Sequence, residues 1–201
     1  MRAMITTGAF VAVICVMAVW LYSRRSATRG KPIVGDQDHS PSAARVYLDL
    51  RATALATTPE SVQLLRDSPD PFGVLMEMGL PSGVVMVTSF ASGDASIYFG
   101  MGGGMLGGIG HATTSAAAKQ WVSAAAAYLT TLSLATDYPL PAAGRIRFYV
   151  LTRKGVLTGE GDGDAIRIGT DPLNRLFAAA DNVITQFRLL DQSGQPHEPG
   201  N

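Results

Sequence analysis

The pattern of apolar and polar positions begins with one long apolar run near the N-terminus. Residues 5–22 (ITTGAFVAVICVMAVWLY) contain no charged side chain. At 1.5 Å per helical residue the run spans about 27 Å, close to the hydrocarbon thickness of a bilayer. It ends in Trp20 and Tyr22, which prefer the headgroup level, and Arg24 follows at once. The run therefore predicts a transmembrane helix, in preference to a cleaved signal peptide or a buried core helix.

Basic residues on either side of this run indicate its orientation. Arg2 precedes the run alone, whereas Arg24, Arg25, Arg29 and Lys31 follow it. Because positive charge is retained on the cytoplasmic side, the remaining chain is expected to face the cytoplasm, from a bacterial inner membrane.

The polar segments divide the chain into five parts. Residues 23–40 form a basic stretch without periodicity, typical of a flexible linker, and residues 191–201 have the composition of a disordered tail. The predicted parts are an N-terminal tail (1–4), a transmembrane helix (5–22), the linker (23–40), a globular domain (41–190) and the C-terminal tail (191–201).

Helical periodicity marks several segments of the globular domain. A first helix is predicted after Ser40 and Pro41, with an apolar stripe at Val46, Tyr47, Leu50 and Ala54. Thr58 and Pro59 restart the chain as a short helix that carries Val62 and Leu65, and a helical turn is predicted over 71–78. An amphipathic helix is predicted over 114–134, and a final one after Asp171 and Pro172.

Two β-hairpins separate these helices. Residues 84–90 (VVMVTSF) are apolar on both faces, as in a central strand, and residues 96–99 return beside them. Residues 144–152 alternate strictly between apolar and polar positions, and residues 156–161 form their partner. The order of elements predicts an α+β fold, in which two hairpins form an antiparallel sheet with helices packed on it.

Composition narrows the possible functions. The 16 basic and 16 acidic residues give no net charge, which argues against a general nucleic-acid binder. The one cysteine lies within residues 5–22, so neither an intrachain disulfide nor a cysteine-based zinc site is possible. We expect neither a metal nor a cofactor.

The glycine-rich segment 100–110 (GMGGGMLGGIG) is the most distinctive local feature. Gly102, Gly104 and Gly107, with Gly103 between them, satisfy G-x-G-x-x-G after a strand and before a helix, an arrangement that can bind phosphate. However, the strand belongs to a hairpin, the helix starts late, and no acidic residue follows at the expected distance. Close backbone packing or a flexible lid is the interpretation we favour.

Four side chains or groups could carry chemistry. His111 could act as a general base or anion contact, or could simply be a loop residue. Glu77 lies among apolar residues, where a carboxyl can acquire a raised pKa, unless it points outward from a short helix. Arg147 shares a strand face with Arg145 and could bind an anion, or be ion-paired. Residues 160–171 faintly match a calcium loop, although Ala165 and Arg167 break the pattern; a solvated hairpin loop is favoured.

Three runs carry a resemblance to a known family: LMEMGLPSG (75–83), SIYFGMGGGMLGGIGH (96–111) and RFYVLT (147–152). They are similar to the M-[DE]-x-G-x-P, S-x-Y-F-x-x-G-G-G and R-F-Y-x-L-T runs of a family of uncharacterised bacterial proteins. The resemblance covers residues 43–190 and implies one folded unit, but no activity.

The leading hypothesis is therefore a membrane-tethered, non-enzymatic interaction module that binds a partner protein or its own copy. The alternative is a small-molecule or phosphate-binding site, possibly hydrolytic, where the glycine-rich segment, His111, Glu77 and Arg147 converge. A third hypothesis is a scaffold in an envelope assembly.

Overall fold

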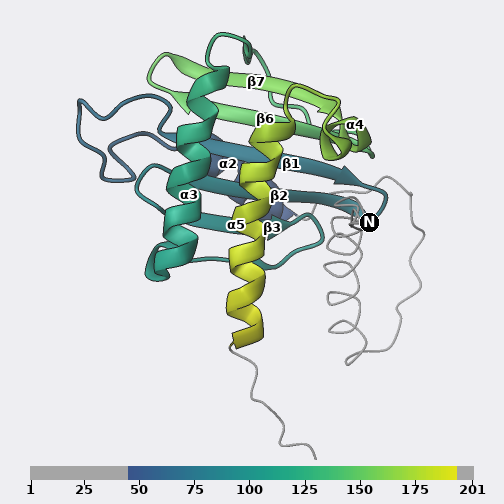
Figure 1. Ribbon diagram of the computed structural model, residues 1–201, viewed down its shortest axis with the longest axis horizontal. Coiled ribbons are helices and arrows are strands. Elements are labelled where there is room, and N and C mark those ends of the chain that lie inside the picture. The colour runs from purple at the N-terminus through teal and green to yellow at the C-terminus, as the bar shows by residue number, and fades with distance from the viewer. Residues whose placement is uncertain (1–44, 194–201) are drawn as a thin grey trace, which may run out of the picture. The chain divides into compact units, whose positions relative to one another are not determined.

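Seven antiparallel strands form one sheet in the computed structural model, which describes residues 45–193 (Figure 1). The strand order is β4-β3-β2-β1-β6-β7-β5. The strands are β1 (Gly73–Leu80), β2 (Gly83–Phe90), β3 (Ala95–Phe99), β4 (Gly104–Met105), β5 (Ser133–Leu134), β6 (Arg145–Thr152) and β7 (Gly155–Asp162). The helices are α2 (Arg45–Leu55), α3 (Ala112–Ala125), α4 (Gly163–Ile168) and α5 (Asn174–Ser193), with short 3-10 turns η1 (Gly108–Gly110) and η2 (Ala126–Tyr128). The α+β prediction is confirmed.

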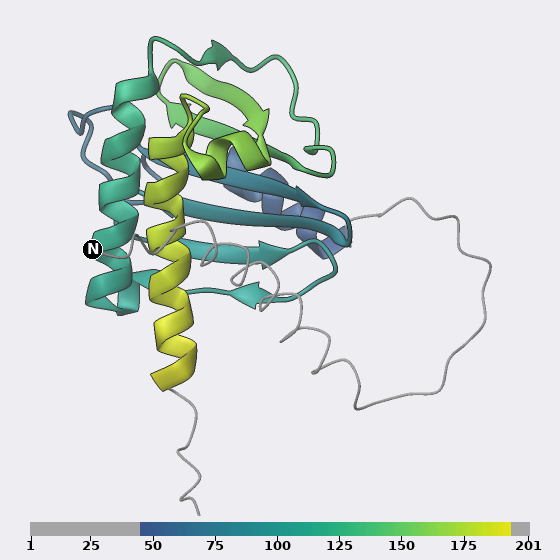
Figure 2. The same cartoon turned by 45° about the vertical axis from the view of Figure 1, so that its right-hand side comes forward.

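The helices cover both faces of the sheet. α3 and α5 lie side by side on one face, and α2 lies on the other (Figure 1, Figure 2). The first face is largely apolar, and Trp121 and Leu176 of the helices and Met76 and Phe148 of the strands are all fully buried. The face below α2 mixes apolar and polar side chains, and Tyr47, Leu75, Met86 and Tyr149 are in its core.

Both predicted hairpins are present, as β2–β3 and β6–β7. The prediction of a helical turn over 71–78 was wrong, because residues 73–78 belong to β1 in the middle of the sheet, which pairs with both β2 and β6. Val74, Leu75 and Met76 are all fully buried, since helices cover both faces of this strand. A strand covered on both faces shows no alternation, so its sequence does not distinguish it from a buried helix.

Two helix predictions also differ from the structure. Residues 58–65 form turns rather than a short helix, and Leu65 is exposed. α3 ends at Ala125 instead of continuing to residue 134, and the chain returns to the sheet as β5 beside β7. Leu132 occupies space that only glycine leaves open, because a Cβ atom at Gly159 would lie 2.4 Å from its Cδ2 atom. Packing on β7 therefore takes precedence over helical propensity.

After β5, the chain crosses the sheet to reach β6. A Cβ atom at Gly79 would lie 2.0 Å from the carbonyl oxygen of Ala142, so this crossing segment approaches β1 at a distance that only glycine permits. Gly144 N–H donates to Gly79 C=O at 2.9 Å, which fixes the end of the segment. The crossing positions residues 138–140 beside α2.

The predicted transmembrane helix (5–22), with residues 1–4 and the linker 23–40, lies outside the described residues. Within residues 45–193, no helix combines the length and apolarity needed to cross a bilayer. α5 extends to Ser193, beyond the predicted domain end at residue 190, and residues 194–201 of the predicted tail are also outside the described range.

Candidate functional site

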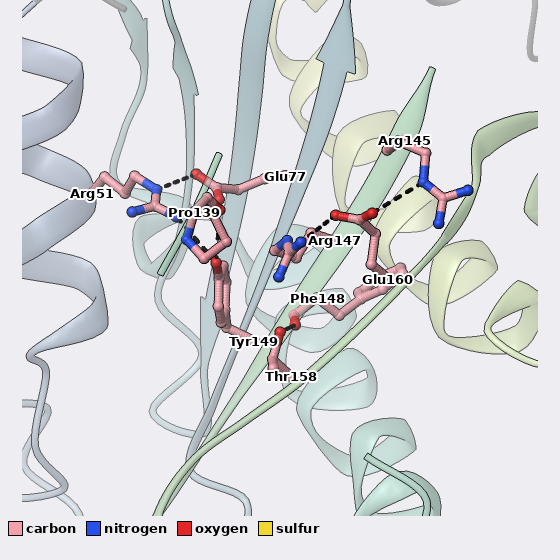
Figure 3. Close-up of polar contacts among 9 residues, drawn as sticks. All are labelled: Arg51, Glu77, Pro139, Arg145, Arg147, Phe148, Tyr149, Thr158 and Glu160. Carbon is pink, nitrogen blue, oxygen red and sulfur yellow. Dashed lines mark hydrogen bonds and ion pairs between the residues drawn. The ribbon is translucent and has the colours of Figure 1, made fainter. Parts of the chain in front are cut away.

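A buried ion pair joins α2 to the middle of the sheet. Glu77 projects from β1 toward α2 and has no exposed surface. Arg51 of α2 donates from Nε to Oε1 at 2.6 Å and from Nη2 to Oε2 at 2.8 Å, the paired geometry in which a guanidinium fits a carboxylate (Figure 3). The Tyr47 hydroxyl, one helical turn earlier, donates to Oε1 at 2.6 Å. Both oxygens of Glu77 are therefore engaged.

The same arginine connects α2 to two further elements. Its Nη2 donates to the Tyr149 hydroxyl of β6 at 3.2 Å and to the Pro139 carbonyl of the crossing segment at 3.3 Å. Tyr149 in turn donates to Pro139 at 3.0 Å (Figure 3). The guanidinium carbon lies 5.6 Å from the centre of the Tyr149 ring, within the range of a cation–π contact. Tyr47, Arg51, Glu77, Pro139 and Tyr149 form what we call the α2 network.

The electrostatics of the α2 network keep its groups in one protonation state. Burial, together with the Glu77 carboxylate, raises the pKa of the Tyr47 phenol far above its ordinary value. Burial also raises the pKa of Tyr149, although Arg51 opposes this. Burial tends to lower the pKa of Arg51, but its hydrogen bond and charge interaction with Glu77 outweigh this and raise it. The arginine therefore stays charged and both phenols stay protonated near neutral pH.

A row of alternating charges continues across the sheet from Glu77. In the strand register, Glu77 is opposite Arg147 of β6, and Arg147 is opposite Glu160 of β7. Glu160 binds Arg147 through Oε2 and Arg145 through Oε1, the latter at 3.0 Å (Figure 3). Arg145 and Arg147 thus share one carboxylate.

The acidic residues that faintly matched a calcium loop have other roles. Glu160 binds the two arginines, and the Asp162 side chain accepts the backbone N–H groups of Asp164 and Ala165, both at 3.0 Å, at the start of α4. These bonds hold the pKa of Asp162 below its ordinary value. Within residues 45–193, no group of three or more metal-binding side chains occurs.

The glycine-rich segment turns through backbone conformations that favour glycine. Gly102, Gly103 and Gly107 have φ values of 101°, 85° and 85°. A Cβ atom at any of these three would meet no atom within 4 Å, so conformation rather than packing requires glycine there. Gly104 is different, because its Cβ atom would lie 2.3 Å from the carbonyl oxygen of Ile97.

His111 lies apart from the other sequence-predicted candidates. It is exposed, immediately precedes α3, and its side chain makes no capping hydrogen bond to the helix. α3 covers the opposite face of the sheet from α2, whereas Glu77 and Arg147 are on the α2 face (Figure 1). The structure brings Glu77 and Arg147 together as strand neighbours, but it does not bring His111 to them.

Exposed apolar side chains occur on both segments that Arg51 joins, α2 and the crossing segment. Val46, Leu48, Tyr138 and Leu140 are between 40% and 62% exposed, and we call them the α2 surface. The first two flank Tyr47 on α2, and the other two flank Pro139, whose carbonyl accepts from Arg51. The network therefore holds these two apolar segments beside each other.

Sequence reasoning missed Tyr47, Arg51, Pro139 and Tyr149 as members of one cluster. A tyrosine and an arginine four residues apart on a helix could have indicated a shared partner, but their partner Glu77 was expected on a helix. Two of the runs that carry the family resemblance include Glu77 and Tyr149, and that resemblance remains a prediction. No family model, curated protein or solved structure matches the chain.

Proposed function

We propose that this chain is a single-pass membrane protein whose cytoplasmic domain is a non-enzymatic interaction module. Its α2 surface would contact a partner protein or a second copy of the chain. The observation that carries the proposal is the α2 network, which uses its polar groups to fix α2 against the crossing segment while apolar side chains of both remain exposed.

The chemistry of the α2 network favours positioning over catalysis. Removing two charges from water is costly, and an apolar pair of similar size often serves stability as well or better. What the ion pair adds is a defined orientation of α2, because its two hydrogen bonds fix the angle and register of the helix on the sheet. A carboxylate bound through both oxygens is also a poor proton acceptor for a substrate.

The exposed side chains suggest what this positioning serves. Single exposed apolar residues are common, but exposed apolar side chains on two segments that lie beside each other can form a contact site. Val46 and Leu48 lie on the element that follows the linker, and Tyr138 and Leu140 lie on the segment that Arg51 holds. A docked partner would cover both segments at once.

Membrane attachment is supported by the sequence alone. The uncharged run 5–22 is long enough to span a bilayer, and the basic residues that follow it favour a cytoplasmic domain.

The alternative, a phosphate or small-molecule site at the glycine-rich segment, has less support. Several backbone N–H groups of the segment and of the residue after it form local hydrogen bonds: Gly102 donates to Phe99, Gly110 to Gly107 and His111 to Gly108. These groups are not available to a phosphate, and Glu77 and Arg147 lie on the other face of the sheet from α3.

Site-specific photo-cross-linking in cells tests the module. A photoreactive amino acid replaces Leu48 in the full-length protein, and the matched control carries it at Ile168 of α4, which is 72% exposed. We expect an adduct of discrete mass from position 48 that disappears when Leu140→Asp is added. An adduct at twice the mass of the chain would identify a second copy. Equal cross-linking from both positions, or none from position 48, would refute the α2 surface as a contact site.

A further inference from the structure

The glycine-rich segment exposes three large apolar side chains at the β4 edge of the sheet. Met101, Leu106 and Ile109 are between 57% and 67% exposed. Met101 follows β3, and the other two follow β4, so all three border the short strand that ends the sheet. We infer that residues 100–110 are a second contact with the lipid bilayer, in addition to the proposed anchor. This inference rests on the proposed membrane attachment.

The backbone of this segment stands clear of the rest of the domain at several points. Cβ atoms at Gly102, Gly103, Gly107 and Gly110 would each meet no atom within 4 Å. Gly102, Gly103 and Gly107 have positive φ angles, at which the backbone turns. Gly100, Gly104 and Gly108 of the segment pack against the sheet and α3, whereas the side chains of Leu106 and Ile109 are exposed and accessible to acyl chains or headgroups.

The charge pattern suits a bilayer better than water. No Asp, Glu, Lys or Arg occurs between Asp94 and Lys119, and the titratable side chains in that interval are Tyr98 and His111. Placing a charged side chain in the hydrocarbon region is costly, whereas uncharged apolar residues enter the boundary of headgroups and acyl chains readily. Insertion of residues 100–110 would therefore require no charge to leave water.

The length of the predicted linker would keep the domain near the bilayer. A flexible chain of the length of residues 23–40 spans on average about 23 Å. A domain of roughly 150 residues has a radius of gyration of about 15 Å. The domain would thus remain within about its own width of the lipid surface, and an exposed apolar loop would meet that surface repeatedly.

A protein strand added to this edge is a weaker explanation of the exposed residues. Edge pairing needs several consecutive extended residues, whereas β4 has only two, Gly104 and Met105. The positive φ angles at Gly103 and Gly107 interrupt the extended backbone on both sides of β4. The short β4 and its flanking glycines therefore favour a contact with lipid over pairing with a protein strand.

A fluorescent probe in the full-length protein tests the contact. The one native cysteine is removed by Cys15→Ser, and Leu106→Cys is labelled with an environment-sensitive dye. Ile168→Cys, at an equally exposed apolar position of α4, is the matched control. Both proteins are reconstituted into phosphatidylcholine–phosphatidylglycerol vesicles, with and without a quencher attached to the lipid chains. We expect blue-shifted emission at position 106 and quenching several-fold greater than at position 168.

The outcomes separate the loop contact from the anchor. If the protein floats with the vesicles but the probe at position 106 emits as in water, the loop contact is refuted and the anchor stands. A blue shift without lipid quenching would indicate a protein contact and would also refute the inference. If the protein does not float with the vesicles, the anchor fails, and the loop contact fails with it.

Discussion

Glu77→Gln is the substitution that most directly probes the α2 network. The amide keeps the size and shape of the carboxyl but carries no charge, so Arg51 would remain buried without its counterion. Removing one partner of a buried ion pair costs about 3–5 kcal/mol, because the remaining charge stays buried without a counterion. The Tyr47 hydroxyl can still donate to the amide oxygen, so its contribution is largely retained.

This loss is a large fraction of the stability of an ordinary domain, which is about 5–15 kcal/mol. For a domain of this size, each kcal/mol changes the melting temperature by about 2–4 °C, so Glu77→Gln is expected to lower it by about 6–20 °C. Near-ultraviolet circular dichroism of the full-length protein in detergent micelles measures the transition through the buried Trp121.

A control on the same helix separates burial from charge. Arg45 and Asp49 are 92% and 72% exposed and lie 4.0 Å apart, so Asp49→Asn is expected to cost about 0–1 kcal/mol. The triple variant Tyr47→Phe, Arg51→Met, Glu77→Leu removes the buried charges together and should recover most of the loss. A Glu77→Gln protein that melts within about 1–2 °C of wild type would refute the view that water is excluded from this ion pair.

Three further predictions concern single positions elsewhere in the domain. Gly79→Ala is expected to destabilise the protein by about 1–3 kcal/mol in urea titrations, because a methyl group meets the backbone of the crossing segment, whereas Gly110→Ala should cost about 0.5 kcal/mol or less. The Thr114 hydroxyl is buried with no hydrogen-bond partner among the described residues, so Thr114→Val should stabilise by about 1–3 kcal/mol in the same titrations; a loss instead would mean that the hydroxyl is satisfied. Burial raises the pKa of Asp181 in the folded state, and Arg188 only partly opposes this. Its contribution to stability is therefore complete below the ordinary carboxyl pKa and is lost as pH rises through the raised value. Asp181→Asn should thus weaken the dependence of the melting temperature on pH over that interval, and an unchanged dependence would contradict this.

The strands that the sequence predicted are those with visible alternation or a clear turn. β6 has Arg145, Arg147 and Tyr149 on one face and apolar residues on the other, so its period of two is visible. β1 has no such contrast, because both of its faces are covered, and it resembled a helical turn. The distinction depends on what lies above and below the strand, which local sequence does not contain.

The site was less predictable than the fold for a related reason. On α2, apolar spacing predicted that Val46 would be buried, whereas the structure buries Arg51 and exposes Val46. An arginine enters a core only when a partner is present, and its partner Glu77 is 26 residues away in the sequence. His111 and Glu77 were grouped because both have useful chemistry, but the chain places them in different parts of the fold.

The two ends of the sheet would matter for copies that the proposed anchor concentrates in a membrane. Copies confined to two dimensions collide often, and a long unpaired strand at either end would allow sheets to join and grow into fibres. β4 and β5 each have only two residues, so neither end offers a template long enough for such growth. Crowded copies would therefore be able to meet through their side chains without polymerising through their backbones.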